Sequence, residues 1–326
     1  MADLITYRDA VAMGIAREMR RDQTVVCLGE DIGAAEGVFK TTVGLFAEFG
    51  PERVWDTPIS EQAIAGAAMG AAMTGLRPVA EIMFSDFLAC CFDYVANEIP
   101  KMRYMTGGQV TVPLVIRTAN GGGLGFGAQH SQAVENWVLA VPGLKIAAPS
   151  TPADMVGLMA SAIRSDDPVV VFEHKKLLAS KGEPPPEEHV VPLGAAEVRR
   201  RGDDVTLVAL AATVPTALEA AERLAGDGIS AEVVDLRCLV PLDARAVLDS
   251  VARTSRLVIV EENPYQGGWG GTLASIVAEE GFYDLDAPIA RVAGECVPLP
   301  FAANLEDVVV PSADRVADKV RRTVGD

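Results

Sequence analysis

One acidic residue, Glu61, stands near the start of the segment DTPISEQAIAGAAMGAAMTGLRP (residues 56–78), which is otherwise mostly alanine, glycine and methionine. Small apolar side chains let a helix pack closely, and a carboxylate buried by such packing needs a compensating partner. A position in the first helical turn favours an acid through the helix dipole alone. The segment alone therefore favours an ordinary first-turn helix acid at Glu61, with acid–base chemistry on a ligand as the alternative.

His130 ends a second candidate segment, ANGGGLGFGAQH (residues 119–130). No G-x-G-x-x-G spacing occurs there and no G-x-x-x-x-G-K-[ST] segment occurs in the chain, which disfavours a nicotinamide-binding oxidoreductase. The glycines predict a loop whose backbone approaches another group closely. An imidazole at the end of such a loop can transfer a proton or serve as a hydrogen-bonded structural residue.

A Gly-Asp-Gly triplet lies in AGDGISAEVV (residues 225–234). Such a triplet opens the metal-diphosphate motif of thiamine-diphosphate enzymes, which closes with an asparagine further along the chain. The corresponding window here, residues 253–257, reads RTSRL. The glycines are better explained as the end of one helix and the turn into a strand, so no metal-diphosphate site is expected in this chain alone.

The five cysteines and three histidines show no zinc-ligand spacing. The adjacent Cys90 and Cys91 lie in an apolar segment, and we expect both to be reduced residues of the core.

Short apolar runs rich in Val, Ile and Leu alternate with helical patterns along the whole chain, which is typical of parallel sheets covered by helices on both faces. The pattern predicts two α/β domains, residues 1–180 and 197–326, joined by a Pro/Glu-rich linker over residues 181–196. Predicted strands include 24–29, 77–84, 112–118, 144–150 and 168–174. Predicted helices of the first domain are 4–20, 61–74, 86–105 and 152–165.

The net charge is −17, which excludes nucleic acid as an expected partner. Residues 187–326 carry 24 acidic and 13 basic residues, a net charge of −11. No apolar run is long enough to span a membrane, and the first residues do not resemble a targeting signal. We therefore expect a cytoplasmic protein that does not associate with a membrane.

Several long stretches in a fixed order carry a family resemblance: GEDIGAAEGVFKTTVGLFAEFGPERVWDTPISEQAIAGAAMGAA, GLRPVAEIMFSDF, RYMTGGQ, GAQHSQ, VPGLKIAAPSTPADMVGLMASAIRSDDPVVVFEHK and VEENP. Over nearly the whole chain the sequence resembles the β subunit of the thiamine-diphosphate-dependent, decarboxylating component of 2-oxo acid dehydrogenase complexes, within the transketolase-like superfamily. The resemblance implies a pyrimidine-binding-type domain followed by a transketolase C-terminal-type domain.

The resemblance also implies the partners. An α subunit would hold Mg²⁺ and the diphosphate of the cofactor, so that an α₂β₂ heterotetramer forms the active site and the missing asparagine motif is expected of a β chain. The subunit-binding domain of a dihydrolipoyl acyltransferase core would dock on the C-terminal domain, and the charge of −11 is compatible with a basic partner.

Three site roles follow from the same resemblance. Glu61 matches the glutamate that hydrogen-bonds N1′ of the cofactor's aminopyrimidine and so promotes loss of the thiazolium proton. Phe87 matches the residue that stacks on that ring, and Met83 a neighbour that lines the pocket, with core packing as the alternative for both. His130 matches an active-site histidine near the reacting carbonyl.

The family further holds a potassium ion through main-chain carbonyls, at positions that match Leu114, Ala162, Ile163, Ser165 and Asp167. Asp167 stands where an asparagine is common in the pyruvate type.

The expected activity is acyl transfer to lipoamide from pyruvate or acetoin, since FEHKKLLASKGE is more similar to the acetoin and general bacterial forms than to the branched-chain form. Alternatives are a branched-chain 2-oxo acid dehydrogenase β subunit, a stand-alone transketolase-like protein and a non-catalytic scaffold of the same fold. The joint presence of Glu61, Phe87 and His130 disfavours the scaffold.

Overall fold

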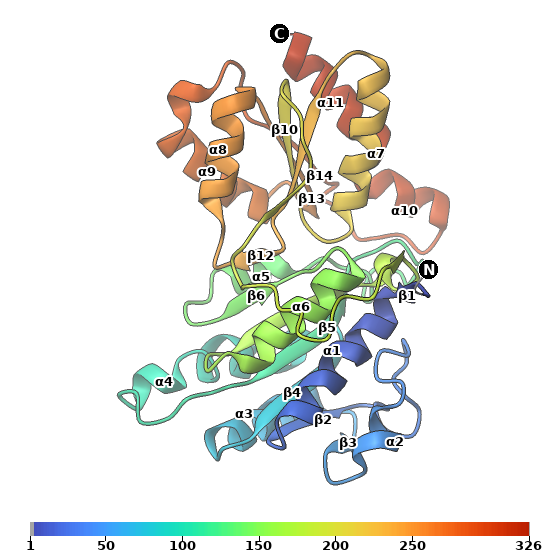
Figure 1. Ribbon diagram of the computed structural model, residues 1–326, viewed down its shortest axis with the longest axis vertical. Coiled ribbons are helices and arrows are strands. Elements are labelled where there is room, and N and C mark those ends of the chain that lie inside the picture. Colours follow the sequence, from blue (N-terminus) through green and yellow to red (C-terminus); the bar gives the residue numbers. More distant parts are fainter. Residues whose placement is uncertain (1–2, 326) are drawn as a thin grey trace. The chain divides into compact units, whose positions relative to one another are not determined.

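The computed structural model describes residues 3–325, which form two compact units (Figure 1). The first unit contains the chain up to Asn120 together with Trp137–Leu193. The second contains Gly121–Asn136 and the chain from Gly194 onward. The glycine-rich segment that carries His130 is therefore part of the second unit, although most of that unit follows it by more than sixty residues.

The first unit is built on a parallel sheet with the strand order β6-β7-β5-β4-β2-β3. Every residue of β2, β5 and β7 is buried, because helices and connecting segments cover the sheet and exclude water from its central strands. The strands are β2 (Val25–Gly29), β3 (Val54–Asp56), β4 (Arg77–Phe84), β5 (Val115–Asn120), β6 (Lys145–Ala147) and β7 (Val169–His174). A separate two-stranded ladder pairs β1 (Ile5–Thr6) with β8 (Lys181–Gly182).

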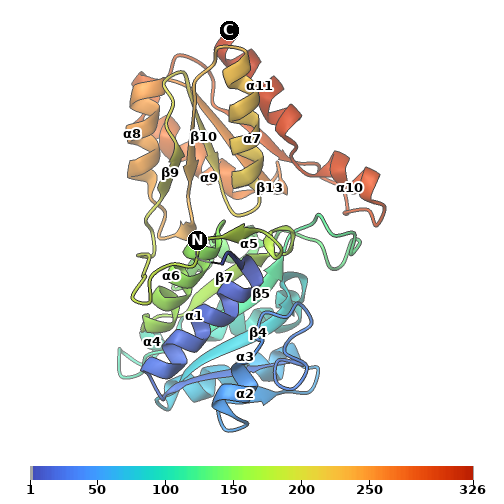
Figure 2. The ribbon, with the colours of Figure 1, turned by 45° about the vertical axis from the view of Figure 1, so that its right-hand side comes forward.

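Two long helices of this unit, α1 (Tyr7–Arg21) and α6 (Pro152–Arg164), lie side by side (Figures 1 and 2). Thr6 and Thr151 cap their first turns by accepting a backbone N–H three residues on. The other helices of this unit are α2 (Leu45–Phe49), α3 (Glu61–Met73), α4 (Met102–Met105) and the short η1 (Ser85–Cys91), η2 (Tyr94–Glu98) and η3 (Lys175–Leu177). One more helix, α5 (Glu135–Leu139), begins in the second unit and ends in the first.

The prediction of one helix over residues 86–105 is wrong. The segment consists of the 3₁₀ helix η1, the single π-helical turn η2 and the four-residue α4. Pro100 has no N–H to donate to a helical hydrogen bond, and it separates η2 from α4. The apolar spacing of the segment could not show the tighter winding of η1.

The second unit has the strand order β14-β13-β10-β11-β9, in which only β9 is antiparallel to its neighbour. Helices α7 and α11 cover one face and α8 and α9 the other (Figures 1 and 2). The strands are β9 (Glu197–Arg200), β10 (Val205–Ala209), β11 (Ala231–Asp235), β12 (Cys238–Val240), β13 (Leu257–Pro264) and β14 (Ala290–Gly294). The helices are α7 (Thr213–Gly226), α8 (Ala244–Thr254), α9 (Trp269–Glu280), η4 (Phe282–Asp284), α10 (Ala303–Val309) and α11 (Ala313–Gly325).

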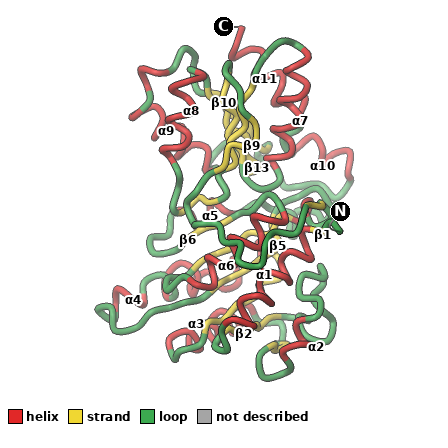
Figure 3. The backbone as a smooth tube through the Cα atoms, in the orientation of Figure 1, coloured by secondary structure: helices red, strands yellow, loops and turns green. Residues whose placement is uncertain are grey.

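Strand and helix alternate along both units (Figure 3), so the predicted two-domain α/β class is confirmed. Within the predicted linker, part of the chain packs on the first unit: the carbonyls of Pro185 and Pro186 accept hydrogen bonds from Arg17, and Val191 is buried. Among the helices of residues 3–325, none has both the length and the apolar character needed to cross a bilayer.

Candidate active site

Glu61 is the first residue of α3, and its side chain is half-buried. No hydrogen bond or ion pair to its carboxylate is present within residues 3–325, although Glu61 lies where the N–H groups of a first helical turn have no intrahelical acceptors. The preceding residue, Ser60, makes no side-chain capping bond either. The carboxylate of Glu61 is therefore free to accept a partner from outside the chain.

Three neighbours experience the charge of Glu61. Burial raises the pKa of Glu30, which directly follows β2, and the charges of Glu61 and Asp31 raise that pKa further. Burial likewise raises the pKa of Cys91 to about 12 and raises that of Cys90, with Glu61 as the next cause in both. Sequence reasoning missed Glu30, whose position immediately after a buried parallel strand was the available signal.

Met83 lies on β4 and Phe87 on η1, two of the elements against which α3 packs. Both side chains are half-buried, whereas Phe84 between them is buried. The ring of Phe87 meets that of Phe84 edge-on at 5.7 Å between centroids. The first unit thus brings Glu61, Met83 and Phe87 onto adjoining elements, and the two apolar residues keep part of their surface outside the core.

Cys90 is exposed, so the expectation that both adjacent cysteines belong to the core is wrong for this residue. Cys91 is buried as expected. Successive residues of a 3₁₀ helix point in different directions, and in η1 Cys91 faces the core whereas Cys90 faces outward.

A buried ion cluster joins the central strands beneath these residues. Arg117 of β5 donates to both carboxylate oxygens of Glu173 on β7, at 2.6 and 2.7 Å, and to Glu81 on β4. All three residues are at least nine-tenths buried. Removing one member would leave an uncompensated buried charge, so the cluster fixes the relative position of β4, β5 and β7.

The glycine-rich loop that leads to His130 is held by two carboxylates of the second unit. The N–H of Gly122 donates to Glu262 at 2.6 Å, and the N–H groups of Gly123 and Gly125 donate to the two oxygens of Glu306 at 2.8 and 3.0 Å. Successive N–H groups that point to one side form a concave anion site, and here side chains of the chain itself fill it.

Glycine is required at this loop for two reasons. Gly123 has φ of +94° and Gly125 of +66°, in the left-handed region that other residues rarely adopt. At Gly122, an added Cβ would lie 2.8 Å from a methyl carbon of Leu299 and 3.1 Å from Glu306. The close backbone approach predicted for these glycines is therefore present, and its partners are protein carboxylates.

His130 is half-buried, and its backbone N–H donates to the carbonyl of Gly127 at 3.4 Å. Just beyond it, the side-chain amide of Asn263 donates to Ala133 at 2.8 Å and to Glu135 at 3.1 Å. Glu262 and Asn263 both belong to the VEENP stretch. Sequence reasoning quoted that stretch without a role for it, and the structure shows that it holds the loop of His130.

Comparison with known proteins identifies the family. Residues 3–181 match the transketolase pyrimidine-binding domain, and residues 194–316 the transketolase C-terminal domain. The chain is 44% identical to the 2-oxoisovalerate dehydrogenase subunit beta of Bacillus subtilis, over 98% of both chains. It is equally identical to the acetoin:2,6-dichlorophenolindophenol oxidoreductase subunit beta of the same organism, over 100% of this chain and 99% of the relative.

A third relative at 44% identity is the pyruvate dehydrogenase E1 component subunit beta of Rickettsia felis, again over 98% of both chains. The chain belongs to the family of transketolase-like dehydrogenase E1 β subunits. Among solved structures, a split-gene transketolase described as an inactive beta4 tetramer aligns over 98% of both chains, with a TM-score of 0.81 and 26% identity.

As in the interpretation from sequence, the Gly-Asp-Gly triplet of this E1 β chain ends a helix. Gly226 closes α7, Gly228 has φ of +81°, and the N–H of Ile229 returns to the carbonyl of Leu224 at 3.0 Å. Within residues 3–325, no group of three or more His, Cys, Asp and Glu side chains is placed to hold a metal ion.

The five carbonyls proposed for potassium in this E1 β chain all accept hydrogen bonds. The guanidinium of Arg77 donates to Ile163 at 3.0 Å and to Ser165 at 3.1 Å. The other three donors are the N–H of Ser165 to Ala162, the hydroxyl of Ser165 to Asp167 and the N–H of Val169 to Leu114. Each oxygen keeps a second lone pair that could meet a cation, but the positive charge of Arg77 opposes a cation at this place.

Proposed function

We propose that this chain is the β subunit of a thiamine-diphosphate-dependent pyruvate-type or acetoin dehydrogenase component. An α subunit completes the active site in an α₂β₂ heterotetramer and holds the diphosphate and Mg²⁺. The assembled component cleaves a carbon–carbon bond next to a carbonyl group and transfers the acyl group to lipoamide.

The free carboxylate of Glu61 carries this proposal. A half-buried carboxylate that has no donor among residues 3–325 costs free energy that a ligand donor recovers. When bound, thiamine diphosphate supplies the carbanion chemistry that amino-acid side chains lack. Glu61 would hold a proton at the ring nitrogen, and the exposed parts of Phe87 and Met83 would give the ring an apolar surface and exclude water from it.

Two features support the need for a partner chain. The Gly-Asp-Gly triplet ends a helix here, which supports an α subunit as the holder of the diphosphate. The outward side of α3 presents Ala63, Ala67 and Gly70, and a Cβ added to Gly70 would meet nothing within 4 Å. Such a smooth surface allows another backbone to approach closely, as an α₂β₂ assembly requires.

The three relatives act, by their names, on different substrates at the same identity of 44%, so identity does not select the acyl donor. The stretch FEHKKLLASKGE favours pyruvate or acetoin. The branched-chain activity is the alternative, because one relative is named for 2-oxoisovalerate.

Co-expression with an α-type chain that carries an intact Gly-Asp-Gly…Asn motif tests the proposal. Turnover would be followed with an artificial electron acceptor, with pyruvate, acetoin and 3-methyl-2-oxobutanoate as substrates. We expect no turnover from this chain alone and thiamine-dependent turnover from the assembly. An assembly that forms but acts on none of the three substrates would favour the scaffold instead, and full activity of the chain alone would exclude the requirement for an α subunit.

The same assembly would dock on an acyltransferase core through the second unit. The charge of −11 over residues 187–326 supports a basic subunit-binding domain as the partner. Binding to that domain should weaken as salt is raised, and binding that is indifferent to salt would exclude an electrostatic contact.

A further inference from the structure

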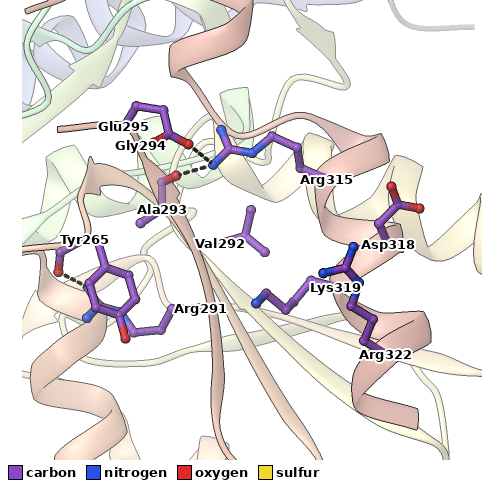
Figure 4. Close-up of a pocket in the computed structure, with 10 residues that line it drawn as sticks. All are labelled: Tyr265, Arg291, Val292, Ala293, Gly294, Glu295, Arg315, Asp318, Lys319 and Arg322. Atoms are coloured by element: carbon purple, nitrogen blue, oxygen red, sulfur yellow. Dashed lines mark hydrogen bonds and ion pairs between the residues drawn. The ribbon is translucent and has the colours of Figure 1, made fainter. Parts of the chain in front are cut away.

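A basic pocket of about 370 Å³ lies in the second unit between β14 and α11 (Figure 4). Four basic side chains line it: Arg291, Arg315, Lys319 and Arg322. The surrounding sequence, residues 187–326, carries a net charge of −11. Positive side chains are therefore concentrated at this site within a region that is acidic as a whole.

Two of the basic residues, Arg291 and Arg315, form ion pairs with carboxylates of the chain and line the sides of the pocket. Arg291 donates to the buried carboxylate of Glu261, with 2.7 Å between Nε and Oε1. Arg315 donates to Glu295 at 2.8 Å and to the carbonyl of Ala293 at 2.9 Å. Because these contacts fix both guanidinium groups, the walls of the pocket are ordered without a ligand.

The side chains of the other two, Lys319 and Arg322, make no hydrogen bond or ion pair with any residue between 3 and 325. The acidic side chain nearest in sequence, Asp318, pairs instead with Arg321 at 2.7 Å. Residues 315, 319 and 322 are spaced four and three apart, so their side chains emerge from one face of α11. Figure 4 shows Lys319 extending from α11 toward Val292 of β14. Two positive charges thus face the cavity without an ion pair of their own, and the carboxylate of Asp318 also lines it.

An aromatic surface completes the pocket. The guanidinium of Arg291 lies over the ring of Tyr265, 4.2 Å from its centroid, and fixes the orientation of that ring. Tyr265 remains 58% exposed, so much of its surface is open to a flat ligand. The site therefore offers two free cations and an oriented ring within one cavity.

We propose that this pocket binds a small phosphate monoester with a flat organic part. The phosphate dianion would pair with Lys319 and Arg322, since two cations match its charge and its oxygens accept charge-assisted hydrogen bonds. The organic part would lie against Tyr265. The volume is at the lower end of the range of about 300–1,000 Å³ for small-molecule sites, which suits a ligand the size of a nucleoside monophosphate. The residues are distinct from Glu61, Phe87 and His130.

Calorimetric titration of the full-length chain tests this site, with adenosine 5′-monophosphate, inorganic phosphate and uncharged adenosine as probes. We expect the nucleotide to bind more tightly than phosphate and adenosine to bind least. The double variant Lys319→Ala/Arg322→Ala should weaken nucleotide binding by about tenfold or more. Raising the salt concentration should weaken binding to the wild-type chain.

A charge-matched control removes two exposed cations outside the pocket, in the variant Arg8→Ala/Arg245→Ala, and should bind like the wild type. The conservative variant Lys319→Arg/Arg322→Lys should retain binding, and it provides the test if the alanine variant does not fold. The proposal is overturned if the nucleotide fails to bind at about 10 mM. It is also overturned if adenosine binds as tightly as the nucleotide. A conservative variant that folds but does not bind the nucleotide would overturn it too. So would an alanine variant that binds the nucleotide as tightly as the control variant does.

Discussion

The two units use carboxylates in opposite ways. In the first unit, Glu61 is half-buried at the start of α3 without a hydrogen bond inside the described chain, and Glu30 nearby has its pKa raised by burial and by neighbouring negative charge. In the second unit, Glu306 is 2% exposed and both its oxygens accept backbone N–H groups of the loop that leads to His130.

This difference separates structural acids from candidate functional ones. Glu306 is satisfied by its own chain, so its interactions contribute to the stability of the unit. Glu61 lacks such a partner, and the cost of leaving it so is expected where a ligand is to be bound. Burial alone would have selected the wrong residue, because Glu306 is the more buried of the two.

The largest effect is expected from Glu61→Gln in the co-expressed assembly. The amide keeps the size of the side chain but cannot hold a proton as a carboxylic acid does, so turnover should fall by about 10²–10⁴-fold. The assembly should remain intact by light scattering, since the carboxylate of Glu61 makes no hydrogen bond or ion pair within residues 3–325. The exposed neighbour Gln62 provides the control, and Gln62→Ala should leave turnover nearly unchanged. Wild-type turnover in Glu61→Gln would refute the role proposed for this acid.

Glu306→Gln should affect stability in the isolated chain. The variant retains one oxygen for the two N–H groups of Gly123 and Gly125 and places an NH₂ group against one of them, which should lower the free energy of unfolding by about 2 kcal/mol. Urea denaturation of the second unit's transition measures this loss. Glu279→Gln, at an exposed position, should cost much less. Equal midpoints for the two variants would show that Glu306 does not hold the loop.

The sequence was sufficient for features that depend on local pattern. The alternation of apolar runs and helical spacing predicted the parallel sheets, and β4 spans residues 77–84 as expected. The Gly-Asp-Gly triplet is the helix end that its glycines indicated. The positions of Glu61, Met83 and Phe87 on adjoining elements agree with the roles implied by family resemblance, which remain predictions.

Contacts between distant residues could not be predicted in this way. Glu306 and Gly123 are separated by 183 positions, and neither residue carries a local signal of the other. Cys90 and Cys91 are alike in the sequence, and the direction in which each points from η1 depends on how that segment packs in the fold. Asn263 and Glu262 stand in a recognised stretch, but their role depends on a loop that the fold brings to them.

Thiol chemistry can test the free charge of Glu61 in the isolated chain. Burial and then Glu61 raise the pKa of Cys90, so less of its thiol is ionised at a given pH. Glu61→Gln removes the second cause and should lower that pKa, which should speed alkylation of Cys90 at pH 8 by about threefold. Cys296 is also exposed and provides an internal control. An unchanged ratio of the two alkylation rates would show that Glu61 does not act on Cys90.

The smallest effect is expected from potassium binding at the main-chain carbonyls, because these oxygens, like those of Glu306, already accept hydrogen bonds. Because Arg77 donates to the carbonyls of Ile163 and Ser165, a potassium ion would add little stability. Replacing Na⁺ by K⁺ at constant ionic strength should raise the thermal midpoint of the wild-type chain by only about 1–2 °C. Differential scanning fluorimetry measures this shift.

Arg77→Gln sharpens the comparison between satisfied and free oxygens. The variant removes a positive charge and frees at least one carbonyl, so its midpoint should be lower than that of the wild type but should respond more strongly to K⁺ than to Na⁺. Arg8→Gln, at an exposed position, should behave like the wild type in both salts. If K⁺ stabilises the wild type as much as it stabilises Arg77→Gln, the guanidinium does not compete with the ion, and a carbonyl that already accepts one hydrogen bond is still available to a cation.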